Sequence, residues 1–205
     1  LAADFDVKLH VGAIGNLSVP DLHIAGTAQY EPAELHAEWA HRFGASRRTM
    51  LQLALTYRRW SEFDGFVART VECPEAAPGC GALPEEPVGL ADTLVPRAGF
   101  EQGIELGSVE LALRAGYFYE ASPLPAQSGV ANRFDNARHV LTLGYGVRFQ
   151  TQGHGARLDL AYQHHELVAR LHEKLGSVSS DNPGYPAASS DGTVDVVALA
   201  LEFEL

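Results

Sequence analysis

Apolar and polar residues alternate along most of this 205-residue chain with a period of two. From His139 to Phe149 every second residue is large and mostly apolar, whereas the residues between them are polar or small. Successive side chains of a β-strand point to opposite faces, so this pattern predicts a strand with one apolar and one polar face. On a helix the same residues would spread around the circumference and leave no apolar face to bury.

The same alternation recurs in eight segments, which we predict to be β-strands. They cover residues 4–14, 33–43, 49–60, 94–106, 108–119, 138–150, 156–166 and 194–205. Most of them are longer than the five or six residues that are usual for strands of soluble proteins. The chain is therefore predicted to be all-β, with antiparallel strands.

The connections between these segments alternate between short and long. Residues 44–48, 106–107 and 151–155 are short turns, whereas 61–93, 120–137 and 171–193 are long. Residues 15–32 follow the same rule if 22–30 is a loop or a hairpin extension. Strict alternation puts all long connections at one end of the sheet, which is typical of outer-membrane barrels.

Aromatic residues on the apolar faces sort into two levels, one near each end of the predicted strands. Those near the short turns are Phe43, Phe149 and Phe203, and those toward the long connections are Tyr57, Tyr117 and Tyr162. Two aromatic girdles are expected of a transmembrane β-barrel, whose apolar face meets lipid. A soluble lipid-binding barrel, with its apolar face inside, is the alternative that periodicity alone leaves open.

On the polar faces of the predicted strands, charges of both signs occur together with glycines. The charged residues are Arg97, Arg114, Arg148 and Arg157, with Glu101, Glu105, Glu110 and Asp159. We expect them to form a salt-bridged lumen wall. The glycines at 99, 103, 116, 144 and 146 indicate either the close approach of something inside the barrel or its curvature.

Composition narrows the classes of function further. The formal net charge is −11, which argues against a nucleic-acid partner. The longest nearly uninterrupted apolar stretch, 196–201, is far shorter than the roughly 20 residues of a transmembrane helix. A mean hydropathy of −0.08 therefore excludes a helical membrane bundle and is compatible with a barrel.

Two cysteines, Cys73 and Cys80, lie in a Pro- and Gly-rich stretch. They are either two loop thiols or a small disulfide loop, which would require an oxidising compartment. We favour the disulfide, because no histidine or further cysteine pair lies nearby to complete a zinc site.

Two sequence motifs carry a resemblance to a known family. Residues 114–125 read Arg-Ala-Gly-Tyr-Phe-Tyr-Glu-Ala-Ser-Pro-Leu-Pro, and residues 135–139 read Asp-Asn-Ala-Arg-His. This stretch resembles the FadL family of outer-membrane transporters, and residues 55–63, which include Trp60-Ser-Glu-Phe63, resemble a strand of the same family. The resemblance implies a structural or substrate-path role for the motif positions Trp60, Phe63, Arg114, Ser122, Pro123, Pro125, Asp135, Arg138 and His139.

The resemblance implies a fourteen-stranded barrel with an N-terminal hatch. Residues 1–205 would then be a single β-barrel domain from its C-terminal part, without the hatch and the first strands. The implied function is passive uptake of long-chain fatty acids or aromatic hydrocarbons across the outer membrane of a Gram-negative bacterium, with no cofactor. The implied partners are membrane lipids, lipopolysaccharide, the hydrophobic substrate and the barrel-assembly machinery.

Other interpretations of the same residues are possible. A complete eight-stranded barrel would be structural or adhesive rather than a transporter. The group Ser122, Asp135 and His139 could suggest a catalytic triad, but we interpret Asp135 and Arg138 as a turn device in which the aspartate pairs with the arginine. His164 and His165 point to opposite faces of a strand and are poorly placed to share a metal ion. We therefore expect neither an enzyme nor a metal site.

Overall fold

A computed structural model describes residues 2–9, 21–63, 65, 67–72, 88–126, 133–151, 154–173 and 184–204. These residues form ten strands and one 3-10 turn, η1 (Trp60–Glu62). The strands are β1 (Ala2–Leu9), β2 (Asp21–Tyr30), β3 (Ala33–Phe43), β4 (Thr49–Arg59), β5 (Val67–Glu72), β6 (Thr93–Leu106), β7 (Val109–Glu120), β8 (Arg138–Thr151), β9 (His154–Glu173) and β10 (Ala187–Glu204). None of the described residues belongs to a helix long and apolar enough to cross a membrane.

The chain divides into two compact units, each with its own sheet. Residues 1–33 and 59–91 form the first unit, and residues 34–58 and 92–205 form the second. The first unit holds a three-stranded sheet of order β1-β2-β5, in which both strand pairs are antiparallel. The second holds a seven-stranded sheet of order β10-β9-β8-β7-β6-β4-β3.

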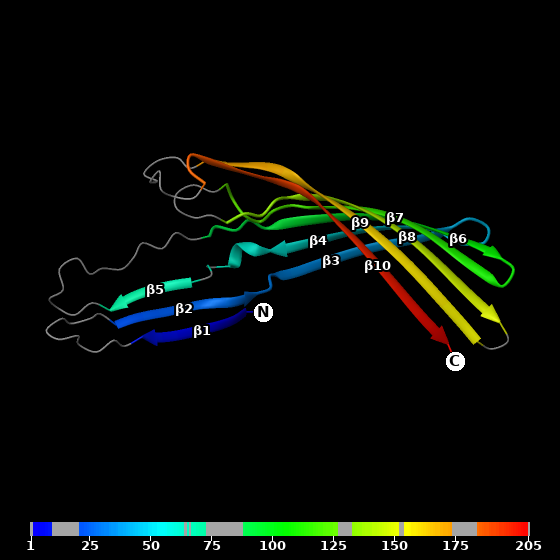
Figure 1. Cartoon of the computed structure of the whole chain (residues 1–205), viewed down its shortest axis with the longest axis horizontal. Coiled ribbons are helices and arrows are strands. Elements are labelled where there is room, and N and C mark those ends of the chain that lie inside the picture. The colour runs from blue at the N-terminus through cyan, green and yellow to red at the C-terminus, as the bar shows by residue number, and fades with distance from the viewer. Residues whose placement is uncertain are drawn as a thin grey trace. The chain divides into compact units, whose positions relative to one another are not determined.

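The seven-stranded sheet confirms the predicted antiparallel all-β fold. Its short connections β3–β4 and β6–β7 lie at one end, and β8 and β9 also meet at this end, where Thr151 pairs with His154 (Figure 1). Gly107, with a φ of 64°, allows the tight turn between β6 and β7. Among the described strands β3 and β10 form the two edges of the sheet, which is therefore open here.

The predicted strand count of eight is too low, and two strands lie where connections were expected. β2 occupies residues predicted as loop or hairpin extension, and β5 lies within the predicted long connection 61–93. β9 and β10 also extend into the predicted loop 171–193, because the last residues of β9 pair with the first residues of β10. The predicted strand 4–14 is confirmed up to Leu9 as β1, and residues 10–14 lie outside the described residues. β1 pairs with β2 in the smaller sheet. Cys73 and Cys80 lie outside the described residues, so their disulfide stays a prediction.

Cross-strand register assigns each residue of the seven-stranded sheet to one of two faces, because directly opposed residues share a face. Leu143 is opposed by Ala115 on β7 and by Tyr162 on β9, and Tyr162 is opposed by Val197 on β10. Several other rows of the same face are also apolar, and their large side chains are exposed. Members of this apolar face are Leu53, Leu55, Phe100, Ile104, Leu113, Tyr117, Leu141, Leu143, Tyr145, Phe149, Leu160, Tyr162, Val197, Leu199, Leu201 and Phe203.

Few hydrophobic side chains are buried, and they do not form a core beneath this apolar face. The buried hydrophobic residues of the described chain are Phe63, Val88, Val95, Val140 and Val147. Register places Val95 and Val140 on the opposite, polar face, whereas Phe63 and Val88 belong to the first unit. Of the five, Val147 alone lies on the apolar face, between Leu111 and Leu158. The large apolar face of the seven-stranded sheet is thus not covered by the rest of its own unit.

Candidate functional site on the polar face of the sheet

Charged side chains of the polar face form a ladder of ion pairs across the strands. Arg114 on β7 donates to Glu101 on β6 at 2.8 Å and to Asp159 on β9 at 2.9 Å. Arg157 binds Asp159 at 2.5 Å, and Arg42 on β3 lies 3.9 Å from Glu101. These pairs confirm the predicted salt bridging of this face for Arg114, Arg157, Glu101 and Asp159.

Two glycines on β8 allow Arg114 to reach across that strand. A Cβ atom at Gly144 would lie 3.1 Å from the Cβ of Arg114, and a Cβ at Gly146 would lie 2.7 Å from Oδ1 of Asp159 and 3.2 Å from Nη1 of Arg114. The Arg114 side chain therefore lies over a strand that carries no side chains at these two positions. The close approach that the glycines predicted is made by this arginine.

A second charged group lies where β7 and β8 meet their long connection. Glu120 accepts a hydrogen bond from Arg58 at 2.5 Å and from Nε of Arg138 at 2.7 Å, and Arg58 also binds Glu34 at 2.6 Å. The motif residue Arg138 is therefore paired with Glu120 on the neighbouring strand, and not with Asp135 as the turn interpretation proposed. Because Arg138 and Glu120 face each other in register, this pair ties β7 to β8.

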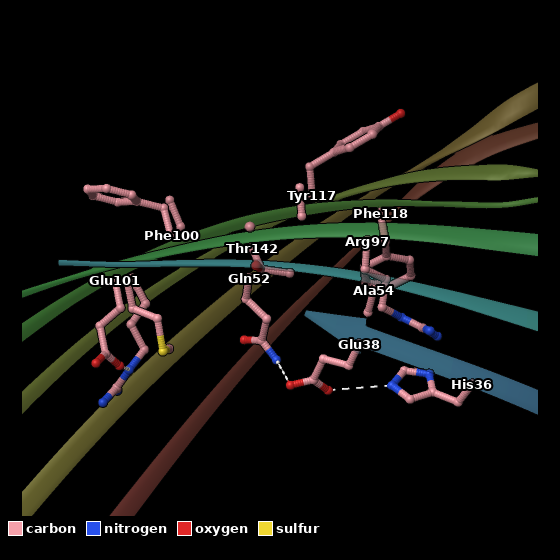
Figure 2. A pocket seen from close by; sticks show the side chains of 16 residues that line it. His36, Glu38, Gln52, Ala54, Arg97, Phe100, Glu101, Tyr117, Phe118 and Thr142 are labelled. Carbon is pink, nitrogen blue, oxygen red and sulfur yellow. Dashed lines mark hydrogen bonds and ion pairs between the residues drawn. The ribbon is translucent and has the colours of Figure 1, made fainter. Parts of the chain in front are cut away.

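A cavity of about 510 Å³ lies against the sheet, mainly on its polar face. Its lining comes from five strands and consists of His36, Glu38, Met50, Gln52, Ala54, Arg97, Ala98, Gly99, Phe100, Glu101, Arg114, Ala115, Gly116, Tyr117, Phe118 and Thr142. Figure 2 shows Glu38, Gln52, Glu101 and His36 on one side of the strands, whereas Phe100 and Tyr117 extend on the other side. Met50, Ala54 and Phe118 also line the cavity, which thus combines charged groups with apolar ones.

Arg97 differs from Arg114, the other arginine of this cavity, in its binding partners. Its Nη1 donates to the hydroxyl of Thr56 at 2.6 Å, and its guanidinium lies 5.6 Å from the ring centroid of Phe118. The Thr56 hydroxyl, which is 3% exposed, is also 2.9 Å from Nδ1 of His36. Within the described ranges Arg97 forms no ion pair, whereas Arg114 binds two carboxylates.

Glu38 occupies the same cavity and is held by neutral groups. Gln52 donates its side-chain amide to Glu38 at 2.8 Å, and Nε2 of His36 lies 3.4 Å from the carboxylate. His36 thus links the Glu38 carboxylate to the Thr56 hydroxyl, which in turn binds Arg97. Sequence reasoning counted Arg97 among the lumen charges but could not separate it from the paired arginines, because pairing depends on register across strands.

The motif residues Ser122, Pro123 and Pro125 lie in the connection that follows β7, and Asp135 lies just before β8. The Ser122 hydroxyl donates to the backbone carbonyl of Asp135 at 3.0 Å, so the two arms of the connection are joined. Arg170 on β9 adds hydrogen bonds from Nη1 to the Ser122 hydroxyl at 3.2 Å and to the Asp135 carbonyl at 3.0 Å. Ser122 and Asp135 therefore interact as parts of a loop anchor.

Arg170 and Asn136 complete this anchor, and sequence reasoning missed both. Nη2 of Arg170 donates to the carbonyl of Leu124 at 2.7 Å. The buried Asn136 donates its amide to the carbonyls of Val168 at 2.9 Å and Ser190 at 2.7 Å, joining the connection to β9 and β10. Asn136 directly follows a motif residue but is not itself a motif position, and Arg170 lies far along the chain from the motifs. Neither residue could therefore be identified from the sequence motifs.

The remaining motif residues are not part of the cavity lining. His139 belongs to the apolar face, where its Nδ1 is 2.7 Å from the hydroxyl of Tyr117. Trp60 and Phe63 belong to the first unit, where their rings lie 6.0 Å and 4.8 Å from that of Tyr30. Of the nine motif positions, only Arg114 lines the cavity.

No three histidine, cysteine, aspartate or glutamate side chains of the described segments are grouped so that they could hold a metal ion. The groups around the cavity can donate hydrogen bonds, carry charge and offer apolar surface. This arrangement is suited to binding a small molecule.

Comparison with known proteins supports the fold. Neither a protein-family model nor a curated protein matches the sequence. The structure is similar to the crystal structure of a FadL homologue from Pseudomonas aeruginosa, with a TM-score of 0.59, 18% sequence identity and 90% of this chain covered. The chain spans 37% of the length of that protein. The resemblance in the motifs is thus confirmed at the level of the fold: this chain is folded like part of a FadL-type β-barrel.

Proposed function

We propose that this chain forms part of a channel in the outer membrane of a Gram-negative bacterium, through which hydrophobic small molecules cross passively. Long-chain fatty acids or aromatic hydrocarbons are the expected substrates. The observation that carries this proposal is the arrangement of the two faces of the seven-stranded sheet. Leu143 and Leu199 are 59% and 64% exposed on the apolar face, whereas Arg114 and Asp159 are paired on the opposite face.

The height of the apolar face agrees with a membrane span. On β8 it extends from Leu141 to Phe149, which is about 26 Å along a strand at about 3.3 Å per residue. A strand tilt of roughly 35–45° reduces this to about 20 Å, close to the apolar band of roughly 25 Å on outer-membrane barrels.

Ion pairs and hydrogen bonds between side chains mark the ends of this face. Toward the long connections, Asp195 accepts hydrogen bonds from the Tyr162 hydroxyl at 2.7 Å and lies 2.8 Å from Nδ1 of His164. At the other end, Phe149 and Phe203 occupy one row with Ala156 between them. Aromatic rings and hydrogen-bonding groups at two levels fit the two interfaces of a bilayer.

Passive transport requires no covalent step from this chain. A molecule with apolar surface crosses the polar outer layer of the membrane poorly, and a protein cavity with apolar walls shields it from water. The cavity offers Met50, Ala54 and Phe118 as such walls, beside charged groups on the same face. Membrane lipids, lipopolysaccharide and the barrel-assembly machinery are the partners this role implies.

Spin labels on the two faces test the orientation that the proposal requires. Labels at positions 141, 143, 199 and 201 should be relaxed by a lipid-soluble agent such as oxygen, and labels at 161 and 198 by a water-soluble nickel complex. A soluble barrel would instead bury the first four labels in protein, away from both agents, and that result would refute the channel.

Uptake tests the function itself. Liposomes that contain the full-length protein should take up labelled oleate or toluene faster than liposomes without protein. Equal rates for both compounds would show that the protein is not a channel for either class of molecule. An eight-stranded structural or adhesion barrel would give this second result while still showing lipid-exposed leucines.

A further inference from the structure

At the end of the long connections, the apolar face of the seven-stranded sheet becomes polar within two rows of β7 to β10. The last mainly apolar row contains Leu143 and Tyr162. Six side chains of the next two rows are aromatic or carry an ionisable group. These six form the polar patch: Tyr117, Tyr119, His139, His164, Glu166 and Asp195. The opposite end of the same four strands stays apolar, since its last row that all four strands share contains Phe149 and Phe203.

One half of the polar patch is a hydrogen-bonded pair of a histidine and an aspartate. Asp195 accepts a hydrogen bond from the Tyr162 hydroxyl at 2.7 Å, and it lies 2.8 Å from Nδ1 of His164. Because a carboxylate can only accept, Nδ1 of His164 is the donor, and Nε2 of the neutral ring is left as an acceptor. The side chains of His164 and Asp195 are 34% and 56% exposed, so the pair presents acceptor atoms to whatever covers this face.

The other half of the polar patch is a group of three rings. The rings of Tyr117 and His139 are stacked, with centroids 6.1 Å apart, and the ring of Tyr119 lies 5.0 Å from that of His139. The Tyr117 hydroxyl, 2.7 Å from Nδ1 of His139, holds the two rings together. A sugar has apolar C–H groups on the face of its ring and hydroxyls around its rim. Exposed rings beside hydrogen-bond acceptors match both of these features.

The charge of the polar patch disfavours a phosphate. Glu166 and Asp195 are its charged groups when the histidines are neutral, and none of the described residues in its two rows is a lysine or an arginine. An anionic head group would therefore be repelled by the carboxylates and would find no basic side chain with which to pair. An uncharged sugar meets no such repulsion, and its hydroxyls can donate to the same carboxylates.

We propose that the polar patch binds the sugar head group of a glycolipid in the outer leaflet, while the acyl chains of this lipid lie on the apolar face. The hydroxyls donate to Asp195, Glu166 and Nε2 of His164, and the sugar ring lies against the rings of Tyr119 and His139. This inference rests on the proposed channel function, because it requires the apolar face to meet lipid and the long connections to lie outside the cell. The lipid would bind to the outer wall of the barrel, and it is not a transported substrate.

Two lipids with the same dioleoyl chains test this inference, because glucosyl diacylglycerol and phosphatidylglycerol differ only in their head groups. Each is titrated onto the full-length protein in detergent, and native mass spectrometry gives the two Kd values. The wild-type protein should bind the glucosyl lipid at least fivefold more tightly than phosphatidylglycerol at pH 7.5. Asp195→Ala should weaken binding of the glucosyl lipid by about fivefold to tenfold, the loss expected for hydrogen bonds to one carboxylate. Tyr119→Leu should weaken it by about threefold through the lost ring contact.

Two control variants make the assignment specific. Glu202→Ala removes a carboxylate from the same strand as Asp195, but on the opposite face, where Glu202 is paired in register with Arg157. Phe149→Leu replaces an aromatic residue at the other end of the same face as the polar patch. Both variants should keep the preference of the wild-type protein for the glucosyl lipid.

The inference is overturned if the wild-type protein binds the two lipids equally or prefers phosphatidylglycerol, or if Glu202→Ala weakens glucosyl-lipid binding as much as Asp195→Ala does. The wild-type comparison holds even if a variant does not fold. Spin labels at positions 143 and 199 keep the two proposals apart. Labels in lipid without a preference for the glucosyl lipid refute the role of the polar patch and leave the channel standing, whereas labels buried in protein refute the channel itself.

Discussion

The two faces of the seven-stranded sheet differ in the exposure and in the pairing of their side chains. The apolar face carries Leu199 and Phe203, which are 64% and 69% exposed, and its side chains make few contacts within the protein. The polar face carries the Glu101–Arg114–Asp159 ladder, in which each charged group has a partner. In water, the first face would be unfavourable and the second ordinary. Under the proposed channel function, the solvent of the apolar face is lipid, and the polar face provides the internal cross-strand contacts.

The largest effect on stability is expected when an arginine is placed on each face of the sheet at the same level of one strand. Leu199 and Ala198 are neighbours on β10 and therefore lie on opposite faces. Leu199→Arg should lower the free energy of unfolding by roughly 2–4 kcal/mol near the membrane midplane, because the charge enters hydrocarbon. Ala198→Arg should change it by less than about 0.5 kcal/mol.

Urea unfolding of both variants in lipid vesicles, followed by tryptophan fluorescence, measures the two effects. If Ala198→Arg were the more destabilising substitution, the assignment of the faces would be reversed and the sheet would belong to a soluble protein.

A smaller effect is expected on the polar face, where space is limited by the crossing of Arg114. Gly146→Ala would place a Cβ 2.7 Å from Oδ1 of Asp159 and force the Arg114–Asp159 pair apart. We expect a loss of about 1 kcal/mol, the upper range for a solvent-accessible ion pair.

Gly99→Ala is the matched control on the same face. Its Cβ would meet Gln52 at an ordinary 3.8 Å, so the free energy of unfolding should stay the same or rise slightly, since alanine is better than glycine in a strand. Equal losses in the two variants would mean that the ladder does not stabilise the sheet.

The smallest effect concerns the border between the apolar face and the membrane surface. Tyr117→Phe removes the hydroxyl that lies 2.7 Å from Nδ1 of His139 and should cost less than about 0.5 kcal/mol, because both groups are exposed. Tyr145→Phe, made in the middle of the same face, should be neutral or stabilising. A larger cost for Tyr145→Phe in vesicle unfolding would contradict the predicted depth of the two residues.

Much of the main sheet could be predicted from the sequence, because period two is a local property. The segments that became β7 and β8 show a nearly complete separation of apolar and polar residues, and their faces follow from it. β2 and β5 were missed because β2 carries a Gly-Thr-Ala interruption and β5 has only six residues. Their pairing partners, and not their own pattern, make them strands.

The candidate site was predicted less well than the sheet. Charges on the polar face could be named from the alternation, but which of them pair depends on register. Arg97 and Arg114 look equivalent in the sequence, and only the arrangement of four strands shows that one is compensated. Arg170 acts on Ser122 over 48 residues of chain, a separation that no local motif spans.

Because Arg114 reaches over β8, position 114 on β7 and positions 144 and 146 on β8 should vary together. A lysine at 114 would end in one point charge and could not serve Glu101 and Asp159 as a forked guanidinium does. A side chain at position 144 or 146 would remove the reason for a long cation at 114. In related barrels, we therefore expect substitutions at these three positions to occur together.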